Sequence, residues 1–229
     1  MHGAGSIGAV SEPAAPTPHG PPEERLAERL EASGTRPVLA RALHELAEID
    51  VAVYRAIAQT PSPTLDEPLR RLSTVADDSK LWLGIAAGLF VLGGRAGRRA
   101  ALTGAAAIAI NSAIVNVPIK NASRRARPDR PGIGVPEQRW VDMPTSTSFP
   151  SGHSASAFAF ASAIGGTLPI AAVPIRSLAS AVAYSRVHTG VHYPGDVVVG
   201  SLIGVTIGEA TALVARGISR RRAARRRDG

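Results

Sequence analysis

The apolar residues of this chain are concentrated in its C-terminal part. Residues 1–79 are polar or amphipathic, whereas residues 80–216 consist mostly of Ala, Val, Ile, Leu and Gly. Five apolar stretches cover residues 81–92, 100–119, 154–173, 175–187 and 197–214. A membrane span needs about 20 apolar residues. The first stretch is therefore long enough only if it begins near Val75 and leaves Asp77, Asp78 and Lys80 among the lipid headgroups.

The pattern predicts an all-α fold, an integral membrane helical bundle of about five to six transmembrane helices. Small residues are abundant in these stretches, and they let membrane helices approach one another closely. An Ala-rich soluble helical bundle is the alternative interpretation. The mean hydropathy of +0.07 does not choose between the two, because it averages a polar part with an apolar part.

The N-terminal part carries a different pattern. Residues 1–22 are rich in Gly, Ala, Pro and Ser without periodicity, which predicts disorder, and they lack the features of a signal peptide. Residues 23–32 resemble a short charged helix. In residues 37–59, apolar side chains recur at helical spacing, which is typical of an amphipathic helix on a surface or interface. We therefore expect a tail at 1–36, a membrane domain at 37–216 and a basic tail at 217–229.

The charge distribution predicts an orientation. The formal net charge is +8, and arginines follow the first, third and fifth apolar stretches (Arg95, Arg98, Arg99, Arg176 and the run from Arg216). Positive loops face the cytoplasm, so we expect a multi-pass plasma-membrane protein with a cytoplasmic C-terminus. Residues 120–153 and 188–196 would then face outward. No base-reading motif accompanies the basic tail, so nucleic acid is not an expected partner.

The two outward connections contain three clusters of polar residues. The first holds Lys120 and Arg127-Pro128, seven residues apart, which would share one face if the segment were helical. The second is Pro150-Ser151-Gly152-His153, in which Ser151 is suited to cap the following helix and to leave free N–H groups for an anion.

The third cluster is Ser185-Arg186 followed by His192-Tyr-Pro-Gly-Asp196. Pro194 can open the next helix, and a turn there would bring the Asp196 carboxylate to the His192 ring. Cations and helix-terminal amides can neutralise a transferring phosphoryl group, while a histidine oriented by a carboxylate can attack phosphorus. A second histidine can protonate the leaving oxygen.

These residues resemble the type 2 phosphatidic acid phosphatase family, whose pattern is Lys-x6-Arg-Pro, Pro-Ser-Gly-His and Ser-Arg-x5-His-x3-Asp. All three motifs occur here in order, and the resemblance covers about residues 45–215. It implies that His192 is the nucleophile, that Asp196 orients it and that His153 is the general acid. It also implies a phosphate site with no metal and no cofactor, formed by five residues (Lys120, Arg127, Ser151, Gly152 and Arg186).

The resemblance further implies a lipid-phosphate substrate: a polyprenyl phosphosugar such as decaprenylphosphoryl phosphoribose, a polyprenyl diphosphate, phosphatidate or phosphatidylglycerophosphate. The Arg- and Ala-rich composition is similar to that of actinobacterial members of this family that act on polyprenyl-phosphate sugars. Membrane lipids are the other expected partners, and a homo-oligomer is compatible with the sequence. Two alternatives stay open: vanadium haloperoxidase-like oxidation, whose enzymes share the motifs, and a non-catalytic lipid-binding protein.

Several neighbouring residues are expected to stay outside the chemistry. His188 lies in the same connection as His192 but off the motif, so we expect it to be a neighbour. Arg124 and Arg125 are expected to contact headgroups, and Trp140 to be an interfacial anchor. The loop at residues 129–149 is long enough to be functional, and we expect it to contribute to headgroup selectivity.

Overall fold

The computed structural model describes residues 22–32 and 37–225, which form helices joined by loops and contain no β-strand. The α-helices are α1 (Pro22–Ala32), α2 (Pro37–Gln59), α3 (Pro63–Val75), α4 (Lys80–Leu92), α5 (Gly94–Ile114), α6 (Lys120–Ser123), α7 (Arg130–Ile133), α8 (Gly152–Thr167), α9 (Ala172–His188) and α10 (Pro194–Arg225). Shorter turns lie at η1 (Asp77–Ser79), η2 (Val115–Ile119), η3 (Glu137–Arg139) and η4 (Pro169–Ala171). The predicted all-α class is confirmed, whereas the predicted disorder at the N-terminus lies almost entirely outside the described residues.

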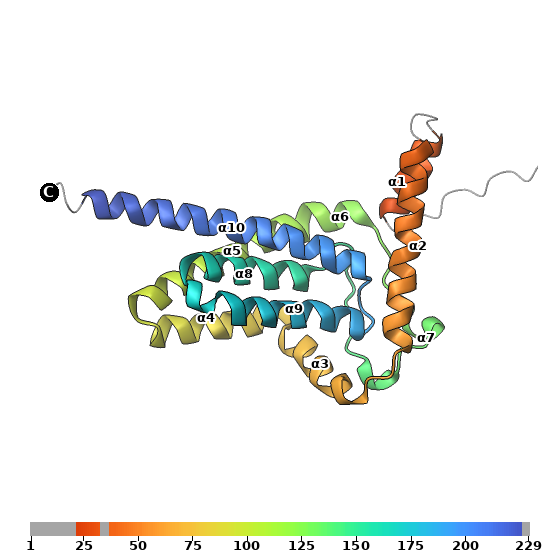
Figure 1. Cartoon of the computed structure of the whole chain (residues 1–229), viewed down its shortest axis with the longest axis horizontal. Helices are drawn as coiled ribbons and strands as arrows, with labels where there is room; N and C mark the ends of the chain where they lie inside the picture. Colours follow the sequence, from red (N-terminus) through yellow and green to blue (C-terminus); the bar gives the residue numbers. More distant parts are fainter. Residues whose placement is uncertain (1–21, 33–36, 226–229) are drawn as a thin grey trace, which may run out of the picture.

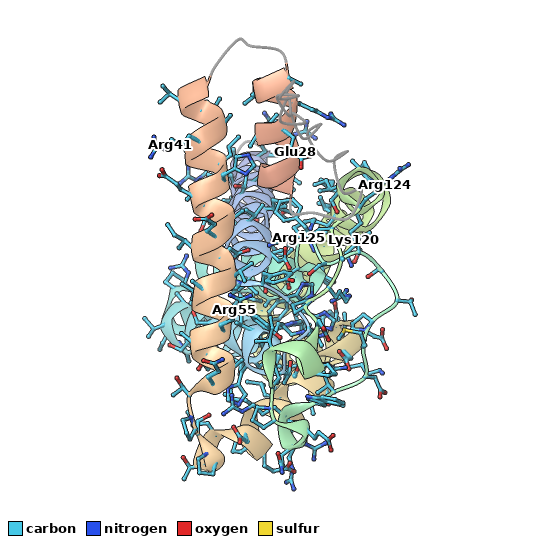
Figure 2. All side chains as sticks on the ribbon, turned by 90° about the vertical axis from the view of Figure 1, so that its right-hand side faces the viewer. Glu28, Arg41, Arg55, Lys120, Arg124 and Arg125 are labelled. Carbon is cyan, nitrogen blue, oxygen red and sulfur yellow. The ribbon has the colours of Figure 1, made fainter. Side chains whose placement is uncertain are left out.

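Helices α4, α5, α8, α9 and α10 run along the long axis of the molecule, and α2 crosses one end of this bundle (Figure 1). α10 extends beyond the bundle at the opposite end. Figure 2 looks onto the crossed end, where α1 and α2 lie side by side. The connections that carry the three motifs lie at this crossed end.

α8 lies at the centre of the bundle, since its residues are buried on almost every side of the helix. Against α10 the packing is so close that a side chain has no room. A Cβ atom on Gly204 would lie 2.2 Å from the carbonyl oxygen of Ala155, and one on Gly208 would lie 2.4 Å from that of Ala159. Glycines spaced by four residues therefore let the two helix backbones touch, as expected for membrane helices.

Aromatic packing closes the other side of α8. The Trp82 ring of α4 is 1% exposed, and its centroid lies 5.4 Å from that of Phe160 on α8. On α5, a Cβ on Gly104 would meet the Phe160 ring at 2.6 Å, so α5 approaches α8 closely as well. These contacts hold α5 and α10 closely against α8.

Only α10 among the described helices is both long and apolar enough to meet a simple criterion for crossing a membrane. The number of crossing helices is therefore still a prediction. α4 has 13 residues, about 20 Å at 1.5 Å per residue. It does not extend back to Val75, because Asp78 and Ser79 adopt positive φ angles of 54° and 60° and break the helix.

The boundary between the third and fourth apolar stretches also differs from the prediction. α8 ends at Thr167 instead of continuing to residue 173, and α9 begins at Ala172. Leu168 has a φ of −136° and ψ of 80°, an extended conformation that the following Pro169 favours by excluding the helical region. The chain therefore turns earlier than hydrophobicity alone suggested.

α2 is a helix as predicted and is amphipathic. Its inner face presents Tyr54 and Ala58 to the bundle, whereas Leu46, Ile49 and Val53 are exposed on its outer face. The C-terminal end of α2 is bound by Arg139, which is 1% exposed and donates to the carbonyl groups of Ile57, Ala58 and Thr60. Arg139 therefore ties the 129–149 loop to α2.

Candidate active site

The second and third motifs meet where α8 and α10 begin. The Ser151 hydroxyl accepts a hydrogen bond from the Ser154 N–H at 3.3 Å, so Ser151 caps α8 as predicted. Pro194 is the first residue of α10, also as predicted. The Ser151 N–H donates to the carbonyl oxygen of Asp196 at 3.0 Å, which joins the two helix starts directly.

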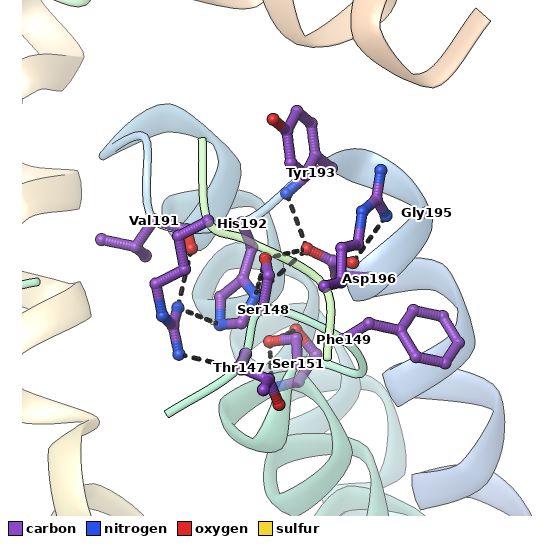
Figure 3. Close-up of polar contacts among 12 residues, drawn as sticks. Thr147, Ser148, Phe149, Ser151, Val191, His192, Tyr193, Gly195 and Asp196 are labelled. Carbon is purple, nitrogen blue, oxygen red and sulfur yellow. Dashed lines mark hydrogen bonds and ion pairs between the residues drawn. The ribbon is translucent and has the colours of Figure 1, made fainter. Parts of the chain in front are cut away.

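His192 and Asp196 are in contact and buried, at 1% and 0% exposure. His192 Nδ1 lies 3.4 Å from Asp196 Oδ2. The same carboxylate oxygen accepts hydrogen bonds from the Ser148 hydroxyl and from the Tyr193 N–H, the latter at 3.0 Å (Figure 3). The carboxylate is thus held from three directions with one oxygen facing the imidazole.

The other ring nitrogen of His192 faces a cation. His192 Nε2 lies 3.2 Å from Nη1 of Arg127, and this guanidinium also donates to the Val191 carbonyl at 2.8 Å. Burial lowers the pKa of His192 to about 3, against the opposing effect of Asp196. The imidazole is therefore neutral at physiological pH, and a proton on Nδ1 leaves the lone pair on Nε2.

Arg125 has a different position from the one predicted. It is 2% exposed, and its guanidinium bridges Asp196 at 2.7 Å and Asp50 of α2 at 2.6 Å. It also lies over the Tyr193 ring, 4.2 Å from the centroid. The expected headgroup contact is wrong for Arg125, because two buried carboxylates attract it inward. Arg124 does point outward and is exposed (Figure 2).

Asp50 and Ser148 complete this network and were not among the predicted residues. Asp50 accepts a hydrogen bond from the Gly195 N–H at 2.6 Å, which fixes the start of α10 against α2. A signal for Asp50 existed, since it shares the buried face of α2 with Tyr54 and Ala58 at helical spacing. Ser148 lies in an irregular loop, and nothing in its sequence context indicated its contact.

The three predicted cations converge. Lys120 Nζ and Arg127 Nη2 lie 3.1 and 3.2 Å from the same Ser146 hydroxyl oxygen. Burial, together with the charges of Arg127 and Arg186, lowers the pKa of Lys120. Arg186 is 1% exposed, and its Nε has no hydrogen-bond partner among the described residues. A cluster of partly buried cations with an unsatisfied donor is suited to an anion.

The route by which Lys120 and Arg127 meet is not the predicted one. Instead of one helix covering both residues, α6 ends at Ser123, because Arg124 adopts a left-handed conformation with φ of 50°. The chain then leaves the helix and returns Arg127 to the site along the loop at residues 124–129. Residues with the expected spacing thus converge through a turn instead of a shared helix face.

His153 lies in the first turn of α8, and its Nε2 is 2.8 Å from Oδ1 of Asp77. The same carboxylate oxygen lies 3.4 Å from Nη1 of Arg186. Asp77 was predicted to lie among lipid headgroups, but the break between α3 and α4 turns it toward these motif residues. It therefore links the second motif to the third.

The remaining candidates lie apart from this cluster. His188 is 1% exposed and its Nε2 lies 3.0 Å from Asp66 of α3, so it faces away from His192. Trp140 donates its indole N–H to the Val135 carbonyl and packs over Arg130 within the 129–149 loop. Within the described chain, no three His, Asp or Glu side chains are grouped to hold a metal ion.

The family follows from comparison of the sequence. Residues 100–219 match the profile of the PAP2 superfamily, the type 2 phosphatidic acid phosphatases. This chain belongs to that superfamily. The resemblance drawn from the three motifs is therefore confirmed, and the matched region contains all eight predicted site residues.

Relatives of this PAP2 protein carry a specific name. It is 37% identical over 180 residues to the decaprenylphosphoryl-5-phosphoribose phosphatase of Mycobacterium tuberculosis, covering 76% of this chain and 94% of the relative. It is 38% identical over 151 residues to the protein of the same name from Mycolicibacterium smegmatis, covering 66% of this chain and 78% of the relative.

Solved structures share the fold of this PAP2 protein. The transmembrane PAP2-type phosphatidylglycerolphosphate phosphatase from Bacillus subtilis superposes with a TM-score of 0.56 at 22% identity, over 87% of this chain and 94% of that one. Aquifex aeolicus LpxE superposes with a TM-score of 0.56 at 27% identity, over 71% and 94% of the two chains. The helical architecture is thus that of membrane PAP2 phosphatases.

Proposed function

We propose that this protein is a multi-pass membrane enzyme that hydrolyses the phosphate of a lipid-linked substrate through a phosphohistidine at His192. The observation that carries this proposal is the setting of the His192 ring. Nδ1 faces a buried carboxylate, Nε2 faces Arg127, and Arg186 nearby has an Nε without a hydrogen-bond partner among the described residues. A neutral imidazole beside a cluster of cations is what nucleophilic attack on a phosphate requires.

In the first step, His192 Nε2 attacks phosphorus while Asp196 stabilises the positive charge that develops on the ring. Lys120, Arg127 and Arg186 neutralise the phosphoryl oxygens. The Gly152 N–H at the start of α8 adds a donor from a helix N-terminus, and Ser151 caps this helix. His153 gives its proton to the leaving oxygen as the bond to phosphorus breaks.

In the second step, water attacks the phosphohistidine. The now neutral His153 takes a proton from the water, and phosphate leaves as His192 is regenerated. The donors in this scheme are all side chains and backbone amides, so the proposed reaction needs no metal. We propose that the active site lies on the outer membrane face, since the motifs lie opposite the Arg-rich connections.

For the substrate, we propose a polyprenyl phosphosugar such as decaprenylphosphoryl phosphoribose. The names of the mycobacterial relatives support this choice, at 37% and 38% identity. An apolar groove of about 560 Å³ between α5 and α10 is consistent with a lipid tail, since its lining includes Leu102, Ile110, Ile207 and Val214. Both helices lead from this groove to the motif residues at the crossed end of the bundle.

A phosphate-release screen tests the proposal. Purified protein in detergent is offered decaprenylphosphoryl phosphoribose, a polyprenyl diphosphate, phosphatidate and phosphatidylglycerophosphate, each with EDTA present. We expect release from the phosphosugar above the others, unaffected by EDTA and inhibited by vanadate, which can adopt the geometry of the transition state. Release that stops in EDTA and returns with Mg²⁺ would refute the metal-free scheme. A folded protein that hydrolyses none of the lipids would favour non-catalytic lipid binding.

Matched histidine variants test the nucleophile. His192→Gln should lose several orders of magnitude in turnover and form no acid-labile phosphoenzyme, because the attacking nitrogen is gone. His188→Gln is the control, since it keeps an amide donor toward Asp66 in a neighbouring buried position. We expect it to retain turnover within about 10-fold. Phosphoenzyme trapped in His192→Gln but absent from His188→Gln would reverse the assignment.

A further inference from the structure

The break between α3 and α4 carries a carboxylate that belongs to none of the three motifs. Asp77 Oδ1 contacts His153 Nε2 at 2.8 Å and Arg186 Nη1 at 3.4 Å. The hydrogen bond with His153, aided by the charge of Arg186, lowers the pKa of Asp77, so the carboxylate is ionised at neutral pH. One oxygen atom therefore joins the proposed general acid to a proposed phosphate-binding cation.

The surrounding chain holds this carboxylate in place. Nη1 of Arg186 also donates to the Ser73 hydroxyl at 2.6 Å and to the Ser73 carbonyl at 3.2 Å, so the end of α3 is fixed to the same guanidinium. Directly after Asp77, Asp78 and Ser79 both have positive φ, a backbone conformation that is strained for a non-glycine residue. Such strain tends to persist at functional sites, where surrounding contacts impose it.

We propose that Asp77 is a positioning residue for the general acid, which it holds with Nε2 protonated and in fixed relation to the phosphate site. This inference rests on the proposed phosphatase function. A histidine that acts as general acid must start as the imidazolium, with both nitrogens protonated, and a carboxylate acceptor at Nε2 favours this charged form and orients the Nε2 proton. Asp77 thus does for His153 what Asp196 does for His192, although at the nitrogen that delivers the proton.

The proton balance of the first step is then complete. The bond between phosphorus and the leaving oxygen breaks as the bond between phosphorus and His192 Nε2 forms. The proton on His153 Nε2 moves from its hydrogen bond with Asp77 to the leaving oxygen. Asp77 stays ionised throughout, and no other reactant is needed. In the second step, the proton taken from water returns to the same nitrogen and restores the contact with Asp77.

A purely structural role would give Asp77 a different signature. If the carboxylate only fixed the turn or neutralised Arg186, its loss would slow every substrate equally. If it acts through the general acid, its loss should matter most for leaving groups that need a proton. A phenolate leaves without protonation, whereas an alkoxide does not. The leaving-group dependence of kcat/KM therefore separates the two roles.

The experiment compares two substrates on the full-length protein in detergent. One is an alkyl-tailed aryl phosphate, and the other is the lipid alkyl phosphate that the wild type hydrolyses best. For Asp77→Asn we expect kcat/KM on the alkyl phosphate to fall about 10- to 100-fold, while the aryl phosphate changes less than about 3-fold. The control is Asp78→Asn, since Asp78 is the exposed neighbour that pairs with Lys80 and Asn tolerates positive φ. This control should match the wild type on both substrates.

The pH profile gives a second readout. The charged groups that act on His153 are Asp77, Arg186 and Lys120, of which only Asp77 favours its protonated form. In Asp77→Asn the alkaline limb of kcat/KM should therefore move to lower pH, and Asp77→Glu should recover part of the alkyl-phosphate activity. In a His153→Gln background, Asp77→Asn should leave the ratio between the two substrates unchanged.

Two results would overturn the inference. An equal fall on both substrates with an unmoved alkaline limb would show that Asp77 only supports the turn. If Asp77→Asn changes the ratio of kcat/KM between the two substrates even in the His153→Gln background, Asp77 acts independently of this histidine. Both results leave the proposed phosphatase function intact, because the wild type still turns over. A folded wild type that hydrolyses neither substrate would instead overturn the proposed function, and this inference with it.

Discussion

Replacing Arg125 by methionine tests how the proposed catalytic pair, His192 and Asp196, is held. The guanidinium bridges Asp50 at 2.6 Å and Asp196 at 2.7 Å, and all three side chains are at most 7% exposed. Methionine keeps an unbranched apolar stem but leaves two buried carboxylates without their cation. Breaking a buried ion pair by removing one partner costs about 3–5 kcal/mol.

The expected loss of stability is large enough to measure by thermal unfolding in detergent, monitored by tryptophan fluorescence. For a chain of 229 residues, each kcal/mol shifts the midpoint by about 2–4 °C, so Arg125→Met should lower it by about 6–20 °C. Arg124→Met is the matched control, because Arg124 is the exposed neighbour. The control should stay within about 0.5 kcal/mol of the wild type.

A double-mutant cycle shows whether the loss comes from the stranded carboxylates. Asp50→Asn removes one charge that Arg125→Met leaves uncompensated, so the double variant should cost about 0.5–3 kcal/mol less than the sum of the single variants. Asp196 is left unchanged in this cycle because its proposed role is catalytic. The reasoning is refuted if Arg125→Met destabilises no more than Arg124→Met, or if the two single losses simply add.

Three further outcomes are expected. Burial lowers the pKa of His192 to about 3, so between about pH 6.5 and 3 the unfolded chain binds a proton that the folded chain does not. The contribution of the neutral His192 to the free energy of unfolding is therefore complete above about pH 6.5 and is lost as the pH falls toward 3. The unfolding midpoint of His192→Gln should depend less on pH between these values than that of the wild type, and an equal dependence would contradict the lowered pKa of His192. Gly204→Ala should destabilise by about 1–3 kcal/mol because its Cβ would overlap the α8 backbone, whereas Gly217→Ala, with open space around it, should be neutral or stabilising; equal midpoints would contradict the close packing. An impermeant thiol reagent applied to intact cells should label a cysteine at Gln138 but not one at Arg221, and the reverse pattern would invert the proposed orientation.

The sequence by itself determined the family and the helical class, and it predicted which groups react. His192 and Asp196 are four residues apart across a short turn, so their contact follows from local geometry and was predictable. The Ser151 cap and the start of α10 at Pro194 are local for the same reason. Each depends on a few adjacent residues whose conformational preferences act independently of the rest of the chain.

Only the tertiary structure decided which other charges enter the site. Arg125 and Asp77 look like surface charges in sequence, because their partners lie far along the chain: Asp50 and Asp196 for Arg125, and His153 for Asp77. Whether a charged side chain faces solvent or a buried counter-charge depends on how helices pack, since burial is stable only where a partner compensates the lost hydration. Helix ends at residues with a left-handed backbone, such as Arg124, were likewise not predicted, because surrounding contacts impose this conformation against the local preference of the residue.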